Sequence, residues 1–196
     1  ERAQLRTGWL CPVRRVVLSI PFGASTHVEK FAKDFLKKFF YQKTCGKQYG
    51  DFIVNIIKPL IDQTFLTLPD ITGFLGSSMG GLISFYMGIN YPHIFKFIFS
   101  YSPAFFAYRK FTFKRLFFKE KPLPGSLPLL LIYCGYSDEL EKTLLPMTEY
   151  VVNKLRKFGF NEDYLYYSFD KKSYHHEKCW SQELTRSFKY LEKHNY

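Results

Sequence analysis

The sequence predicts a single α/β domain, built on a mostly parallel sheet of about five main strands with helices on both faces. Three observations favour this fold. Short apolar runs that end at glycine, proline or serine alternate with longer segments of helical periodicity. A glycine-rich stretch at 73–81 joins one such run directly to a helix. The chain has 196 residues, 46% of them hydrophobic, which is enough for one sizeable core and short for two. We therefore expect one domain over 1–196, in which 1–15 is an irregular basic segment.

The first half of the chain is expected to supply two strands and two helices. Residues 16–20 form a short apolar run stopped by Pro21, which is typical of a buried strand. Phenylalanines recur at helical spacing in 26–40, and a loop with lysine and glycine follows at 42–50. Apolar residues from 52 to 61 form the stripe of an amphipathic helix, which Pro59 is expected to kink or break. Residues 71–75 are a second buried strand.

The second half repeats the alternation of helix and strand. A helix at 82–91 closes before Pro92, and an apolar strand follows at 95–101. Residues 127–134 form the clearest buried strand. The remaining expected elements are a helix at 143–158 with Gly159 as its stop, a strand at 164–169 and a closing helix at 180–191.

The glycine-rich stretch contains a motif for nucleophilic catalysis. Gly76-Ser77-Ser78-Met79-Gly80 fits G-x-S-x-G, the nucleophile elbow, in the strand–turn–helix context that this motif requires. Glycines let neighbouring backbones pass closely at such a strained turn. The first N–H groups of the following helix favour negative charge that develops at the serine. The alternative is a turn that merely packs a helix on a strand, and the context favours Ser78 as a nucleophile.

A serine nucleophile needs a base and a carboxylate that orients the base, in the chain order serine, acid, histidine. Asp138 lies in the loop after the strand at 127–134, at the sheet edge where ligands gather in parallel folds, so we favour it over a merely solvated carboxylate. The candidates behind it are Glu139 and Glu141. The base is expected just before the closing helix, where the sequence has His175 and His176.

Charge, hydropathy and cysteine spacing exclude several other classes. The net charge of +11 admits a nucleic-acid or anionic-membrane partner, but the lysines are scattered and no nucleic-acid motif occurs, so we expect no nucleic-acid partner. No apolar run approaches ~18 residues, so we expect no membrane span. The four cysteines lack metal-like spacing, which favours reduced thiols in a cytoplasmic protein. His176 and Glu177 lack a spaced third ligand, so we expect no metal.

The stretch 49–106 resembles the Putative esterase family of α/β-hydrolases, which includes enterochelin-esterase-like and feruloyl-esterase-like enzymes. The resemblance is carried by Gly50-Asp51-Phe52-Ile53-Val54, Lys58-Pro59-Leu60-Ile61-Asp62, Gly76-Ser77-Ser78-Met79-Gly80-Gly81-Leu82 and Ser100-Tyr101-Ser102-Pro103-Ala104-Phe105. Cys134-Gly135-Tyr136-Ser137-Asp138 is similar to the acid loop of the family. The family histidine stands five residues before a tryptophan, often as H-x-E-x-x-W, and here this selects His175, before Trp180, over His176.

The resemblance implies an α/β-hydrolase fold and hydrolysis of a small-molecule carboxylic ester through an acyl-enzyme, with no cofactor. Ser78 would be the nucleophile, His175 the base and Asp138 the orienting acid. The N–H of Met79 would donate to the oxyanion. The residues expected to border the substrate are Ser77, Phe105 and Trp180.

The front of the family fold has no counterpart in this sequence. The second oxyanion donor normally comes from a loop after an early strand, and only fifteen residues precede the strand at 16–20. We therefore expect an N-terminally truncated sheet in which residues 16–20 pair beside 71–75. Unpaired buried strand edges are costly, so this gap has to close. We also expect a weakened oxyanion hole and impaired activity.

Two other interpretations stay open at this point. A truncated or degenerate hydrolase domain would keep the fold with little catalysis. A basic surface-binding protein is supported by 109–121, where basic residues alternate with phenylalanine, although the resemblance makes this segment a lid or pocket wall. The acyl group, the alcohol and the oligomeric state are not specified by the sequence.

Overall fold

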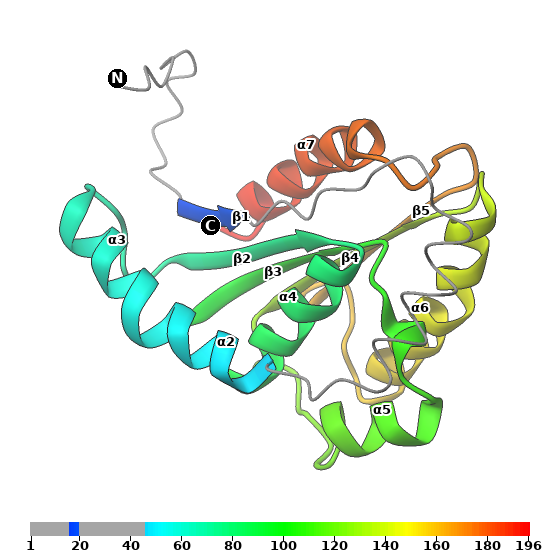
Figure 1. Cartoon of the computed structure of the whole chain (residues 1–196), viewed down its shortest axis with the longest axis horizontal. Helices are drawn as coiled ribbons and strands as arrows, with labels where there is room; N and C mark the ends of the chain where they lie inside the picture. Colours follow the sequence, from blue (N-terminus) through cyan, green and yellow to red (C-terminus); the bar gives the residue numbers. More distant parts are fainter. Residues whose placement is uncertain (1–15, 20–45) are drawn as a thin grey trace.

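A five-stranded parallel sheet forms the centre of the computed structural model, which describes residues 16–19 and 46–196. Its strands lie side by side in sequence order: β1 (Val16–Ser19), β2 (Thr72–Ser77), β3 (Phe95–Tyr101), β4 (Leu129–Gly135) and β5 (Leu165–Asp170). Every neighbouring pair is parallel. The carboxyl ends of the strands therefore share one edge of the sheet (Figure 1).

The first strand closes the gap that the sequence left at the front of the fold. β1 pairs with β2 from Val16 opposite Thr72 to Ser19 opposite Leu75. This pairing gives the backbone of β2 hydrogen-bond partners on its second side, which is the physical reason for expecting it. The prediction of about five main strands, with 16–20 beside 71–75, is confirmed. Ile20 and the helix expected at 26–40 lie outside the described residues.

Helices cover both faces of the sheet, as predicted. The helices α4 (Met79–Asn90) and α6 (Glu139–Lys157) pack on one face, and α7 (Glu177–Lys193) packs on the other (Figure 1). Successive residues of β3 point to opposite faces. Phe97 and Phe99 lie in the core under α7, whereas Ile98 lies in the larger core under α4 and α6. The two central strands, β3 and β4, are thus buried on both sides, which explains why they are continuous apolar runs in the sequence.

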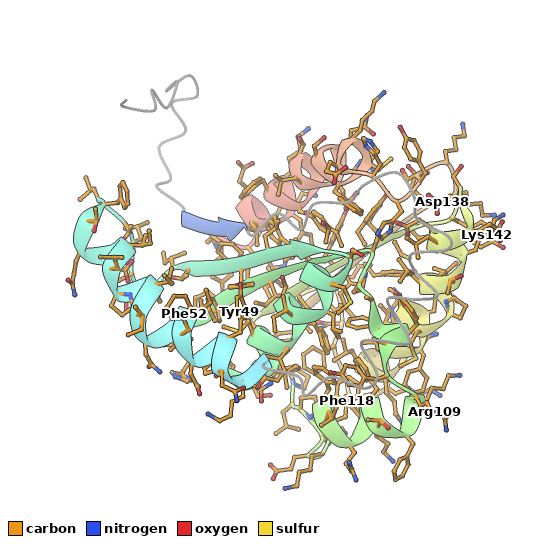
Figure 2. All side chains as sticks on the ribbon, viewed as in Figure 1. Tyr49, Phe52, Arg109, Phe118, Asp138 and Lys142 are labelled. Carbon is orange, nitrogen blue, oxygen red and sulfur yellow. The ribbon has the colours of Figure 1, made fainter. Side chains whose placement is uncertain are left out.

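Residues 46–64 are helical, so the described part of the loop predicted for 42–50 is instead the start of a helix. This segment contains α2 (Gly46–Phe52), a π-helical turn η1 (Ile53–Ile57) and α3 (Lys58–Thr64), with Pro59 tolerated in the first turn of α3. The expected apolar stripe is split. Ile53 is buried, whereas Phe52, Ile56 and Leu60 are 49%, 56% and 55% exposed. A π-helical turn contains more residues than an α-helical turn. Apolar residues spaced at 3.6 residues per turn therefore no longer lie on a single face of the helix. Figure 2 shows Phe52 on α2.

A further helix, which the sequence reading missed, follows β3. After a short 3₁₀ turn η2 (Phe105–Ala107), α5 (Lys110–Phe117) occupies the segment in which basic and phenylalanine residues alternate. Figure 2 labels Arg109 and Phe118 at its two ends. Phe113 and Phe117 stack at 4.4 Å between ring centroids and are buried, whereas Phe111 is 76% exposed. The alternation therefore belongs to an amphipathic helix whose apolar side completes the core.

The buried side of α5 gives a stability prediction with a matched control. We expect Phe113→Ala to lower the free energy of unfolding by about 3–5 kcal/mol, because it leaves a cavity among packed rings. Phe111→Ala, two residues earlier in the same helix, should change it by less than about 0.5 kcal/mol. Urea unfolding followed by circular dichroism measures both. Equal losses for the two variants would contradict the packing of α5.

Candidate active site

Ser78 occupies a strained turn between β2 and α4. Its backbone has φ 56° and ψ −121°, a conformation that residues with a side chain rarely adopt. The N–H of Ser78 donates to the carbonyl of Tyr101 at 2.8 Å. The carbonyl of Ser78 accepts from the N–H groups of Ala104 at 3.0 Å and Leu82 at 3.1 Å. Three main-chain hydrogen bonds thus hold the strained residue at the carboxyl edge of the sheet.

Two glycines are required for this turn by close backbone contacts. A Cβ atom at Gly76 would stand 2.3 Å from the carbonyl oxygen of Gly80. A Cβ atom at Gly81 would stand 2.8 Å from the carbonyl oxygen of Tyr101. The turn therefore brings β2, α4 and the end of β3 closer together than any larger residue allows.

The start of α4 points unpaired N–H groups toward this turn. The first intrahelical bond of α4 runs from Leu82 to the carbonyl of Ser78, so the N–H groups of Met79 and Gly80 precede the helical ladder. Such groups carry the positive end of the helix dipole, which suits a developing oxyanion. Residues 1–15, which precede β1, lie outside the described residues.

The adjacent histidines after β5 have different environments. His175 is held with Nδ1 2.9 Å from Oε1 of Glu141, and its side chain is 8% exposed. His176 is 55% exposed, and its Nδ1 accepts the N–H of Lys178 at the start of α7. His176 therefore caps α7, whereas the imidazole of His175 is buried and oriented by a carboxylate.

Asp138 contacts the main chain near His175 and not its imidazole. Its Oδ1 accepts the N–H of Glu141 at 2.8 Å, and its Oδ2 accepts the N–H of His175 at 2.6 Å. Figure 2 shows Asp138 at the beginning of α6, at the carboxyl edge of the sheet. The preference for Asp138 as the orienting acid is therefore wrong in this geometry, because Glu141 holds the ring.

The error has a definite cause in the helix boundary. α6 begins at Glu139, four residues before the predicted start at 143, so Glu141 lies in the first helical turn. Asp138-Glu139-Leu140-Glu141 has the spacing of a capping box with Asp138 as the N-cap, and this signal was available in the sequence. Applying it would have placed Glu141 beside the strand end, within reach of His175.

Glu141 is fully buried and receives several donors. Its Oε2 accepts the N–H of Gly135 at 2.9 Å and lies 3.3 Å from Sγ of Cys134. Burial, followed by the nearby Glu141 carboxylate, raises the pKa of the Cys134 thiol, so this thiol remains a donor. With His175 and the N-terminus of α6, these groups compensate the buried charge. Cys134 was missed because nothing in its local sequence indicates this contact.

The residues expected to border the substrate have mixed positions. Phe105 has no exposed surface and packs edge-on against Phe85 at 5.0 Å between centroids, so it belongs to the core and that expectation is wrong. Trp180 is 8% exposed, and its ring lies edge-to-face with His175. Ser77 is half-buried at the end of β2.

Within 46–196, no helix combines the length and apolar character that crossing a bilayer requires. The same part of the chain contains no group of three or more His, Cys, Asp or Glu side chains arranged to hold a metal ion.

Comparison with known proteins identifies the family to which this chain is similar. Residues 20–191 match the family model described as Putative esterase. The uncharacterized protein YbbA of Bacillus subtilis is 28% identical over 152 residues, which cover 74% of this chain and 60% of YbbA. Among solved structures, S-formylglutathione hydrolase FrmB of Staphylococcus aureus matches with a TM-score of 0.56 and 20% identity, over 81% of this chain and 64% of FrmB.

A second solved structure extends the comparison. The enterochelin esterase of Shigella flexneri matches with a TM-score of 0.56 and 17% identity, over 68% of this chain and 34% of the esterase. At these identities the structural likeness establishes the α/β-hydrolase fold. The matched part of this chain spans 60% of the length of YbbA, 64% of FrmB and 34% of the enterochelin esterase.

The close contact at Gly76 gives a test of the turn itself. We expect Gly76→Ala to lower the free energy of unfolding by about 1–3 kcal/mol, because its Cβ would stand 2.3 Å from the Gly80 carbonyl oxygen. Gly46→Ala is the control: its Cβ would be 4.0 Å from Ile83, at the start of a helix that favours alanine. Urea unfolding compares the two variants. Unchanged stability of Gly76→Ala would show that the turn is looser than described.

Proposed function

This chain belongs to the Putative esterase family, and on that premise we propose that it is a serine esterase acting on a small-molecule carboxylic ester through an acyl-enzyme. Ser78 is the nucleophile, His175 the general base and Glu141 the carboxylate that orients the base. The observation that carries the proposal is the strained backbone of Ser78 at the head of α4, on the same sheet edge as a buried His175–Glu141 pair.

In the first step the hydroxyl of Ser78 attacks the ester carbonyl carbon. Nε2 of His175 takes the hydroxyl proton, while Nδ1–H donates to the carboxylate of Glu141, which stabilises the imidazolium that forms. The carbonyl oxygen becomes an oxyanion, which the N–H of Met79 stabilises at the positive end of α4. When the tetrahedral intermediate collapses, His175 returns its proton to the leaving alcohol and the acyl group stays on Ser78.

In the second step water completes the hydrolysis. His175 removes a proton from a water molecule that attacks the acyl carbon, and the proton then goes to Oγ of Ser78 as the acid leaves. The chemistry uses no cofactor. A weakened oxyanion hole and a cytoplasmic location stay predictions.

The first functional prediction concerns the nucleophile. A fluorophosphonate probe should label Ser78 in the folded protein, because the serine lies in a strained turn at the sheet edge that also carries His175 and Glu141. Ser78→Ala should abolish labelling and the hydrolysis of p-nitrophenyl acetate. Ser126→Ala, in the exposed turn before β4 at the opposite sheet edge, should leave both unchanged. Peptide mapping by mass spectrometry identifies the labelled residue. Labelling at Ser77, or none in folded protein, would refute the assignment.

The second functional prediction separates the two acids. Glu141→Gln should lower kcat for p-nitrophenyl acetate by about 10³–10⁴-fold, because the imidazolium loses its buried counter-charge. Asp138→Asn should cost much less, since it weakens only main-chain contacts to Glu141 and His175. Steady-state kinetics of both variants makes the comparison. A larger loss in Asp138→Asn would restore Asp138 as the orienting acid.

A further inference from the structure

The hydrogen bonds around the His175 loop tie it mainly to β4 and α6. The carbonyl of Ser173 accepts N–H groups of Tyr136 at 3.0 Å and Ser137 at 2.9 Å, and Asp138 holds the N–H of His175. These contacts fix the loop relative to the acid. Ser78, however, is fixed by Tyr101 at the end of β3 and by Ala104 in the loop after it. Main-chain bonds join these supports, but they do not fix the imidazole ring itself. Catalysis therefore needs a side-chain contact that sets the ring relative to the nucleophile.

Trp180 and Ser102 supply this connection. Nε1–H of Trp180 donates to Oγ of Ser102 at 3.0 Å, and the indole ring stands 4.9 Å from the imidazole of His175, at 88° between the planes. Ser102 lies one residue beyond Tyr101, whose carbonyl holds Ser78. Ser102 is fully buried with φ 40°, and its N–H donates to the carbonyl of Tyr133 at 2.7 Å. The acceptor is thus held in place as firmly as the elbow beside it.

We propose that Trp180 and Ser102 form a positioning pair, which sets the imidazole of His175 relative to the nucleophile elbow. The inference rests on the proposed function of the site. Glu141 fixes Nδ1 of the ring, and the indole edge-to-face contact fixes its tilt. Trp180 is hydrogen-bonded to Ser102, which follows the residue whose carbonyl holds Ser78. A movement of the elbow is therefore transmitted through the indole to the imidazole. The pair touches no reacting atom and acts through His175.

The test compares Trp180→Phe, Ser102→Ala and the double variant with a matched control. Trp180→Phe keeps an aromatic ring and removes the N–H, and Ser102→Ala removes its acceptor. Ser187→Ala is the control: it removes the buried acceptor of the Tyr101 hydroxyl, another bond between α7 and β3, seven residues beyond Trp180. Loss of a buried bond is therefore common to Ser102→Ala and Ser187→Ala, and only the former affects the imidazole.

Each single variant of the pair should lower kcat for p-nitrophenyl acetate by about 10- to 100-fold, with KM unchanged within about twofold, because a misplaced base slows proton transfer without weakening binding. The double variant should be no slower than the slower single variant, since both remove one interaction. Ser187→Ala should keep the wild-type kcat. An unchanged kcat in Trp180→Phe, or an equal fall in Ser187→Ala, would overturn the positioning pair.

A second measurement does not depend on activity. In ¹H–¹⁵N spectra of the imidazoles, wild-type His175 should show one tautomer with the proton on Nδ1, facing Glu141. Trp180→Phe and Ser102→Ala should broaden or shift these signals, and Ser187→Ala should not. Absence of fluorophosphonate labelling in the wild type would defeat the proposed function alone. Imidazole signals unchanged in both pair variants would defeat the positioning pair, whatever the activity.

Discussion

The strained backbone of Ser78 is the constraint on which the remaining site depends. A residue with a side chain at φ 56° costs on the order of 1–3 kcal/mol, so the surrounding structure has to hold it there. Tyr101 at the end of β3 accepts the N–H of Ser78, and Ala104 in the following loop donates to its carbonyl. This close approach requires glycine at Gly76 and Gly81. The motif glycines are thus consequences of how tightly one strained residue is clamped between β2, β3 and α4.

The clamp continues across the carboxyl edge of the sheet as a series of main-chain bonds. Ser78 donates to Tyr101 at the end of β3, and Ser102 donates to Tyr133 near the end of β4. The loop after β4 in turn donates, from Tyr136, to the loop that carries His175. Each step joins the end of one parallel strand to the next. Ser78 and His175 lie 97 residues apart in the sequence. These bonds fix both residues relative to the same edge of the sheet.

Much of the fold followed from local patterns, because buried parallel strands are continuous apolar runs bounded by residues that stop strands. The strand at 95–101 has the predicted bounds, and β1 lies where hydrogen-bond satisfaction required it. The residues at which helices begin were harder to predict from the sequence. α6 and α4 begin earlier than their apolar stripes, because their first turns contain capping residues and candidate site residues in place of core residues. Roles that depend on tertiary contacts, such as that of Ser102, leave no periodic signal.

The choice between Asp138 and Glu141 shows why proximity in sequence to a strand end does not identify the acid. Both carboxylates lie at this edge, but they accept hydrogen bonds from different donors. Asp138 accepts hydrogen bonds from two main-chain N–H groups. One belongs to Glu141 in the first turn of α6, and the other belongs to His175. That arrangement turns Glu141 back toward the sheet, where Gly135, Cys134 and the helix dipole compensate a fully buried charge. A carboxylate that is buried and so compensated orients an imidazole without competition from water, whereas one that caps a helix is already bound to the main chain. Asp138 therefore holds the main chain around the buried carboxylate, and Glu141 has the environment that the proposed orienting acid needs.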